Sequence, residues 1–307
     1  MSDLKLFSTK QKNIVELASF EAKLEKTLQK LFEDNLEELL GVRFIQSEYR
    51  TSNGGRIDTI GIDENNCPVI IEYKKSSNEN IINQGLFYLD WLLDHKADFE
   101  VIVHKSEHKV HLDEVEWSAP RLICVASDFS KYDQYAVNQI NRNIDLLRYK
   151  FFDGDFLLLE QLTQVSQSNS DLAETKKIKT LKTKSTKSSQ RTFNIHVAQL
   201  SENLSNVLSE LDDFVRSLDS KIAYKELKFY AAYSLVRNFV CVEAISTQDK
   251  LLVYLKLHEE QFLNSKIKCR DVSKIGHYGT GNTEFTIKTL EEVEQLKPYI
   301  KLSLGNI

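Results

Sequence analysis

The chain has 307 residues, of which 41% are hydrophobic and 10% aromatic, so it can supply the cores of two ordinary globular domains. Its formal net charge of -5 argues against a protein coated in nucleic acid, although an enzyme can confine its basic residues to one cleft. Its four cysteines lie far apart without a Cys-x-x-Cys motif, which excludes a disulfide scaffold and a zinc framework and favours a reducing compartment. There is no signal-peptide core and no apolar run near the roughly 18 residues of a membrane span, so we expect a cytoplasmic protein without membrane contact.

The N-terminal part of the chain predicts helices that alternate with strands. The first helix has leucines at helical spacing and ends at Gly41. The predicted elements are, in chain order, a helix over 19–41, a strand over 42–49, a two-stranded hairpin over 54–75, a helix over 79–97, strands over 99–104 and 121–126, and a helix over 131–143. This alternation favours an α/β fold for residues 1–160.

Residues 161–191 have a different composition. Aromatic residues vanish, and seven basic residues stand among Ser, Thr and Gln with two acidic ones. Such a segment cannot bury enough apolar area to offset its ordering entropy, so we interpret it as a flexible basic linker. The remainder, 192–307, predicts a smaller α+β domain: a helix over 193–218, strands over 229–235, 239–245, 251–257 and 284–287, and a helix from Leu290 onward.

The hairpin carries charged residues inside its apolar strands. Its polar turn centres near residue 65, and Asp58 and Glu72 are each seven positions from that centre, so a simple hairpin places them opposite each other. Glu72 and Lys74 lie on one face of the strand and Tyr73 on the other. Facing residues have Cβ atoms about 5 Å apart, and two carboxylates that close repel each other and are costly to desolvate. A fold gains from this arrangement only if a positive charge lies between them.

Two kinds of positive charge fit. One is Lys74, in a structural ion pair. The other is a divalent cation, Mg²⁺ or Mn²⁺, because Mg²⁺ takes one or two protein carboxylates and keeps waters as its other ligands. In that case Asp58 and Glu72 hold the metal, the carbonyl of Tyr73 adds a ligand, and Lys74 orients the attacking water or stabilises charge on a phosphate. The residues alone leave both alternatives open.

The order of motifs resembles the PD-(D/E)XK nuclease superfamily. The matching pieces are a helix, Gly-Gly-Arg-Ile-Asp58, a turn, Val-Ile-Ile-Glu72-Tyr-Lys74, and a helix with Gln84-x-x-x-Tyr88. Within the superfamily the chain is most similar to the NucS-like and RecB-like branches, over roughly residues 20–130. Ile57 stands where the family name has a proline. The resemblance implies a restriction-endonuclease-like mixed sheet flanked by helices.

The resemblance also implies roles for individual residues. Asp58 and Glu72 would bind the metal, and Lys74 would assist the water. Gln84 is implied to be catalytic, with Tyr88, four residues later on the same helical face, as its support. An acid on the first helix completes such sites; the match is Glu25, with Glu33 as the alternative. Arg56 and Lys75 flank the hairpin and are candidate phosphate contacts.

The implied function is a metal-dependent endonuclease that hydrolyses DNA phosphodiester bonds, in repair or in defence. Many nucleases of this build pair to cut both strands, so a homodimer is compatible with the resemblance. The C-terminal part resembles a small domain of unassigned function that follows such nucleases. Two alternatives remain: a catalytically silent module with the nuclease fold that binds nucleic acid or a partner, and a nuclease licensed by a partner protein docked on the C-terminal domain.

Overall fold

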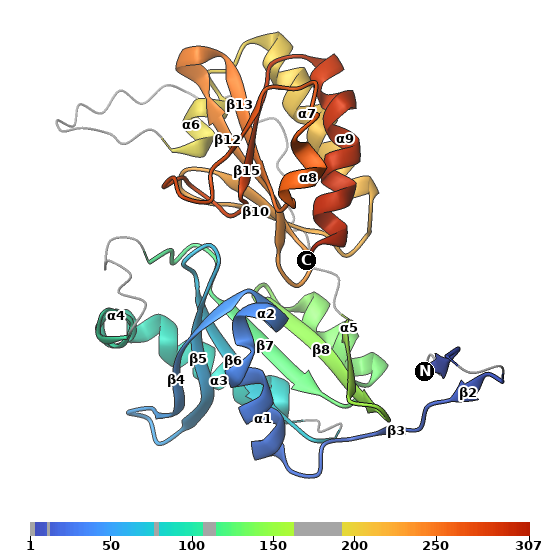
Figure 1. Ribbon diagram of the computed structural model, residues 1–307. Helices are drawn as coiled ribbons and strands as arrows, with labels where there is room; N and C mark the ends of the chain where they lie inside the picture. Colours follow the sequence, from blue (N-terminus) through green and yellow to red (C-terminus); the bar gives the residue numbers. More distant parts are fainter. Residues whose placement is uncertain (1–3, 11–12, 77–79, 107–114, 163–191) are drawn as a thin grey trace. The chain divides into compact units, whose positions relative to one another are not determined.

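The computed structural model describes residues 4–10, 13–76, 80–106, 115–162 and 192–307 (Figure 1). The chain divides into two compact units, Met1–Thr163 and Gln164–Ile307, and each is described by itself. Of the linker predicted over 161–191, residues 163–191 lie outside the described part. In the described ranges, every helix is too short or too polar to cross a lipid bilayer.

The N-terminal unit has a mixed α/β fold whose seven-stranded sheet is flanked by helices, which confirms the predicted fold class. Its strand order is β3-β8-β7-β6-β5-β4, with β9 paired to β8. Strands β4, β5 and β6 are antiparallel, whereas β6, β7 and β8 run parallel. The elements are β1 (Phe7–Ser8), β2 (Val15–Glu16), β3 (Ser19–Phe20), α1 (Glu25–Asp34), α2 (Leu36–Leu40), β4 (Val42–Arg50), β5 (Arg56–Asp63), β6 (Pro68–Tyr73), α3 (Ile81–Asp94), α4 (Lys96–Lys105), β7 (Arg121–Ala126), α5 (Lys131–Gln139), β8 (Asn143–Phe152) and β9 (Phe156–Gln161).

Helices α1 and α3 cover opposite faces of this sheet. Phe32 of α1 packs edge-on against Tyr73 of β6, with ring centroids 5.6 Å apart. Ile70, three residues earlier in β6, lies instead in the core cluster that includes Leu89 and Leu92 of α3. Because side chains alternate faces along a strand, Ile70 and Tyr73 point to different sides. Glu72 shares its face with Ile70 and therefore lies on the α3 side.

Two parts of the N-terminal unit differ from the predictions. The strand predicted over 99–104 is wrong, because these residues belong to α4. Phe99 and Val103 are buried four positions apart while Val101 between them is 47% exposed, which is helical and not strand periodicity. The predicted helix over 131–143 ends at Gln139 as α5, and the hairpin of β8 and β9 that follows was not predicted.

The C-terminal unit contains a six-stranded antiparallel sheet in the order β10-β11-β12-β13-β15-β14. The predicted helix over 193–218 is two helices, because Ser201 caps the second one by accepting a hydrogen bond from the Leu204 N–H. Its elements are α6 (Phe193–Val197), α7 (Glu202–Ser217), β10 (Ala223–Glu226), β11 (Ala231–Ser234), β12 (Asn238–Ile245), β13 (Lys250–Leu255), α8 (Glu259–Phe262), β14 (Cys269–Asp271), β15 (Thr283–Ile287) and α9 (Leu290–Gly305).

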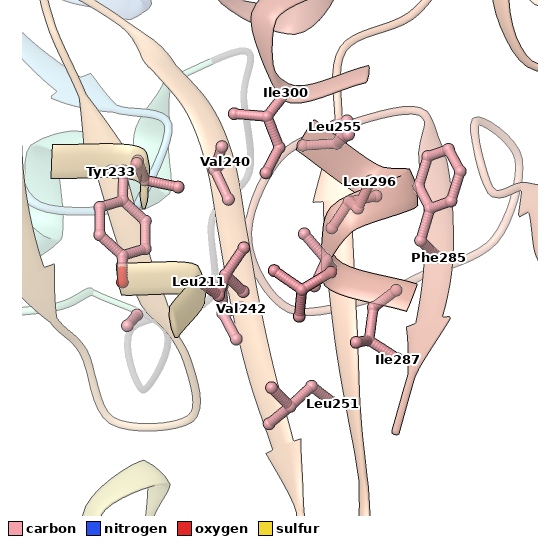
Figure 2. Packing of buried hydrophobic residues seen from close by; sticks show 14 of the residues in the cluster. Leu211, Tyr233, Val240, Val242, Leu251, Leu255, Phe285, Ile287, Leu296 and Ile300 are labelled. Atoms are coloured by element: carbon pink, nitrogen blue, oxygen red, sulfur yellow. The ribbon is translucent and has the colours of Figure 1, made fainter. Parts of the chain in front are cut away.

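One apolar core holds the C-terminal unit together. Figure 2 shows Leu211 of α7 and Ile300 of α9 beside Val242, Leu255 and Phe285 from three neighbouring strands. All five side chains are fully buried. The two long helices therefore pack on one face of this sheet, as their apolar spacing requires.

Candidate active site

Asp58 and Glu72 face each other where β5 and β6 separate. The last backbone pair between these strands is Thr59 with Ile71, and the same register continued by one step sets Asp58 opposite Glu72. Beyond that pair, the two strands are joined by hydrogen bonds from backbone N–H groups to the side-chain carboxylates. The Asp58 N–H donates to Glu72 Oε1 at 3.1 Å, and the Tyr73 N–H donates to Asp58 Oδ2 at 3.1 Å. Each acid is thus held by the backbone of the other strand.

Glu72 is fully buried and Asp58 is half-buried, and neither carboxylate forms an ion pair in the described part of the chain. Glu72 is 0% exposed, and its Oε2 has no hydrogen-bond partner among the described residues. Burial, followed by the negative charge of Asp58, raises the pKa of Glu72 to about 9. Burial also raises the pKa of Asp58. Across the described ranges, neither carboxylate has a Lys or Arg nitrogen within ion-pair distance.

Lys74 lies near the two acids without pairing with them. Its ammonium contacts Glu25 Oε2 at 3.1 Å, and its backbone N–H donates to the Val125 carbonyl at 2.9 Å. The Lys74 charge lowers the pKa of Asp58 and of Glu72, but less than burial raises each pKa. The structural ion pair of Lys74 with the two acids, one of the alternatives left open above, is therefore not formed.

The two acids proposed for the first helix occupy different places. Glu25, the first residue of α1, reaches Lys74. Glu33 accepts hydrogen bonds from Thr59 Oγ1 at 2.6 Å and Gln29 Nε2 at 3.0 Å, on the α1 side of the sheet. Gln29 also donates to the Asp58 carbonyl at 2.9 Å, so α1 fixes the backbone of β5. Of the two, Glu25 is the one that contacts a predicted site residue.

Gln84 and Tyr88 hold the beginning of β5. The Gln84 amide donates to the Tyr88 hydroxyl at 3.2 Å, and the same hydroxyl accepts the Arg56 N–H at 3.2 Å. Tyr88 is 6% exposed, and a Cβ added to Gly55 would lie 2.5 Å from its ring. Gln84 was expected to be catalytic. In the described part of the chain its hydrogen-bond partner is Tyr88, and it makes none with Asp58 or Glu72.

The two candidate phosphate contacts lie at the protein surface. Arg56 has a side chain that is 60% exposed, and its Nε pairs with Glu48 Oε2 at 2.9 Å. Lys75 is exposed, and its carbonyl accepts a hydrogen bond from the Tyr149 hydroxyl at 2.8 Å. Arg56 is the first residue of β5, which carries Asp58, and Lys75 lies two residues after the end of β6, which carries Glu72.

Glu48 is a site residue that the sequence analysis missed. The pairs Ser47 with Thr59 and Tyr49 with Ile57 set Glu48 level with Asp58 on the neighbouring strand. Its negative charge raises the pKa of both Asp58 and Glu72. Glu48 and Asp58 are each five positions from residue 53, so the hairpin arithmetic that paired Asp58 with Glu72 finds this acid too.

The site fits a divalent cation with few protein ligands. No group of three or more His, Cys, Asp or Glu side chains in the described ranges is arranged to hold a metal. Mg²⁺ needs only one or two carboxylates, because it keeps waters as its other ligands. Glu72 Oε2 is buried without a hydrogen-bond partner in the described part of the chain, and burial is the main cause that raises the pKa of both acids, so a bound cation would favour their ionised forms. The two carboxylates of Asp58 and Glu72 therefore fit the donor set that Mg²⁺ or Mn²⁺ would need here.

Comparisons with known proteins found few similar chains. No family model matches this sequence. An uncharacterized protein of Haemophilus influenzae is 29% identical over 304 residues, covering 98% of this chain and 99% of that protein. Among solved structures, a repair endonuclease from Pyrococcus abyssi has a TM-score of 0.30 and 18% identity, and the match covers 43% of this chain and 50% of that one. An EndoMS–dsDNA complex has a TM-score of 0.26 and 14% identity, covering 47% of this chain and 64% of that one. This chain thus spans half to less than two thirds of those two chains, and at these TM-scores neither likeness defines its activity.

Proposed function

We propose that this protein is a Mg²⁺- or Mn²⁺-dependent endonuclease that hydrolyses phosphodiester bonds in DNA. One observation carries the proposal: Asp58 and Glu72 are locked face to face, and one buried oxygen of Glu72 has no partner in the described part of the chain. Burying such a pair is costly, and a bound cation would offset that cost.

Asp58 and Glu72 hold the ion in this account. Tyr73 contributes its backbone only, since its side chain is buried. The Tyr73 N–H points toward Asp58, and in a β-strand the carbonyl of the same residue points to the same side, so the Tyr73 carbonyl would add a third ligand. The bound ion supplies Lewis acidity toward a phosphoryl oxygen and a water of lowered pKa.

Lys74 acts on the water or on the phosphate. Its side chain is 20% exposed and is tied to Glu25, which leaves the remaining N–H donors of the ammonium for an attacking water or for charge on the phosphate. Gln84 and Tyr88 serve the site indirectly, by fixing the backbone at Arg56, two residues before Asp58. Arg56 and Lys75 contact phosphates beside the scissile bond.

The C-terminal unit is proposed to be an accessory domain, joined to the nuclease domain by the basic segment over 161–191. A chain that ends before residue 192 tests this role. If the truncated chain cuts as the full chain does, cleavage is autonomous. If the truncated chain binds Mn²⁺ but does not cut, whereas the full chain cuts, then the accessory domain or a partner docked on it licenses cleavage.

The proposed activity is tested with a panel of labelled nucleic acids. Single-stranded, duplex, mismatched and branched DNA, together with RNA, are incubated with the purified full chain in Mg²⁺, in Mn²⁺ and in EDTA. We expect metal-dependent cleavage of at least one DNA, and its loss in the variants Asp58→Ala and Glu72→Ala. Cleavage by both variants at the wild-type rate would overturn the catalytic assignment. Salt-dependent DNA binding without cleavage of any substrate would favour the silent module instead.

A further inference from the structure

Glu48 adopts a backbone conformation that glutamate rarely takes. Its φ of 53° lies in the left-handed region, inside β4 and not in a turn. For a residue with a Cβ this conformation costs about 1 kcal/mol or more, and such residues concentrate at functional sites. Glu48 also lies level with Asp58 on the neighbouring strand. Backbone strain works against a glutamate at this position, so a gain elsewhere must offset it.

The contact that Glu48 makes is with Arg56. Its Oε2 accepts a hydrogen bond from Arg56 Nε at 2.9 Å, and the Glu48 side chain is 34% exposed. The guanidinium has donors on more than one edge. Glu48 occupies the Nε, while the Arg56 side chain stays 60% exposed. The two terminal nitrogens are the pair that matches two oxygens of one phosphate.

Arg56 is held at a second point, through its backbone. Its N–H donates to the Tyr88 hydroxyl at 3.2 Å, and Tyr88 is itself buried and bonded to Gln84. The adjacent Gly55 lets the Tyr88 ring come closer than any side chain would allow. Arg56 is therefore fixed at its main chain by α3 and at its guanidinium by β4, two residues before Asp58.

We propose that Glu48 is a positioning residue for Arg56, which it holds as a phosphate clamp beside the two metal-binding acids. The clamp rests on the DNA binding that the proposed function requires, because it needs a nucleic-acid phosphate next to Asp58 and Glu72. A long arginine side chain loses considerable rotamer entropy when it binds, and a guanidinium already oriented by a carboxylate loses less. The strained backbone of Glu48 sets the carboxylate where that orientation is possible. Glu48 touches neither phosphate nor cation in this account.

The decisive variant is Glu48→Gly. Glycine adopts positive φ without penalty, so a purely structural Glu48 predicts a variant of equal or higher thermal stability with unchanged DNA binding. The clamp predicts equal or higher stability together with DNA binding weakened about fivefold, the loss expected for one oriented charged contact. Binding is measured by fluorescence anisotropy of a labelled oligonucleotide, single-stranded and duplex, in Ca²⁺. Asp155→Gly is the matched control, because exposed Asp155 has a φ of 62° in the turn between β8 and β9.

A double-mutant cycle shows whether Glu48 acts through Arg56. Arg56→Ala should weaken DNA binding at least as much as Glu48→Gly, and the two changes together should cost little more than Arg56→Ala alone. Glu48→Gln keeps an acceptor for Nε and should restore part of the affinity. Arg50→Ala is the control, since Arg50 faces Arg56 in the last pair of β4 and β5 and is also exposed. The loss of DNA affinity caused by Arg50→Ala should be the same whether position 48 is Glu or Gly.

The outcomes separate this inference from the proposed function. If Glu48→Gly weakens DNA binding equally in the wild type and in the Arg56→Ala variant, the inference is overturned. An effect of Glu48→Gly on Mn²⁺ affinity alone also overturns it. Failure of the wild type to bind either oligonucleotide overturns it too. If the cycle shows coupling while no DNA is cut in Mg²⁺ or Mn²⁺, the phosphate clamp stands and the endonuclease proposal fails.

Discussion

The backbone N–H of Asp58 donates a hydrogen bond to the Glu72 carboxylate across 3.1 Å. At this point a side chain takes the place that a strand carbonyl normally fills, and the reciprocal bond from Tyr73 to Asp58 completes the exchange. Only one oxygen of Glu72 is used, and the other is buried without a partner in the described part of the chain. The relationship therefore fixes the geometry of two acids and leaves a donor atom free for a ligand.

Replacing either acid by its amide should abolish metal binding without unfolding the domain. Asp58→Asn and Glu72→Gln keep the shape of the side chain but remove its charge, and a divalent cation needs charged oxygen ligands here. Isothermal titration with Mn²⁺ should show binding to the wild type and none to either variant, with cleavage lost in parallel. Asp90→Asn, on the exposed side of α3, is the control and should titrate as the wild type does. Mn²⁺ binding of wild-type strength in both amide variants would exclude this pair as the ligands.

Without a divalent ion, Glu72 should make the fold less stable as pH rises. Its folded pKa of about 9 lies above the ordinary value of 4.5, so between these values the native state binds more protons than the unfolded state. The free energy of unfolding then falls with rising pH, by at most about 1.4 kcal/mol per pH unit from this group. The contribution is fully favourable below pH 4.5 and lost as pH passes 9.

Chemical denaturation in EDTA from pH 5 to pH 9 measures this effect. Other carboxylates titrate as well, so the difference between wild type and Glu72→Gln is the informative quantity. The variant should gain stability relative to wild type as pH rises. A constant difference across this range would show that Glu72 ionises normally in the folded protein.

Lys74→Ala should reduce turnover far more than it weakens metal binding. In the described ranges the ammonium forms its ion pair with Glu25 and with neither Asp58 nor Glu72, so under the proposed function its loss removes a group that acts on the water or the phosphate. A loss of about 100-fold or more in kcat is typical for such a group, with the Mn²⁺ dissociation constant changed only a few-fold. Lys75→Ala, the exposed neighbour, should leave kcat nearly unchanged and weaken DNA binding slightly. A Lys74 variant with normal kcat and weak Mn²⁺ binding would contradict the role assigned to it.

Gly55→Ala should destabilise the N-terminal unit. The added Cβ would lie 2.5 Å from the Tyr88 ring and 2.8 Å from Thr51 Oγ1, both of which are buried. Overpacking of this kind costs about 1–3 kcal/mol, measured as the free energy of unfolding. Gly276→Ala is the control, since a Cβ there meets no atom within 4 Å, and it should change stability by less than about 0.5 kcal/mol. Equal stability of both variants would mean that Tyr88 moves freely away from β5.

The sequence contained the paired acids in a form that simple geometry recovers. A hairpin centred near residue 65 puts Asp58 opposite Glu72, and the register of β5 and β6 agrees with that count. Local patterns of this kind depend on the backbone alone, so they are visible before tertiary structure is known. The strand periodicity that set Glu72 and Lys74 on one face does not reach Lys74, because β6 ends at Tyr73 and the Lys74 ammonium contacts Glu25 of α1.

Contacts that depend on tertiary structure were not visible. The partner of Lys74 is Glu25, 49 positions away, and no local pattern in the chain indicates that contact. The Tyr88 hydroxyl accepts the Arg56 N–H from 32 positions away, and that contact follows from how α3 packs on the sheet. The run over 99–104 is apolar enough for either a strand or a helix, and packing of Phe99 and Val103 selected the helix. The left-handed backbone of Glu48 is likewise imposed by its neighbours.

Anomalous diffraction from a crystal soaked in Mn²⁺ tests the central claim most directly. We expect a peak within coordination distance of Asp58 and Glu72, with Glu72 Oε2 and the Tyr73 carbonyl turned toward it. Mn²⁺ bound at other sites with no peak between Asp58 and Glu72 would contradict the account. So would a pair without an ion whose two carboxylates point to different faces of the sheet.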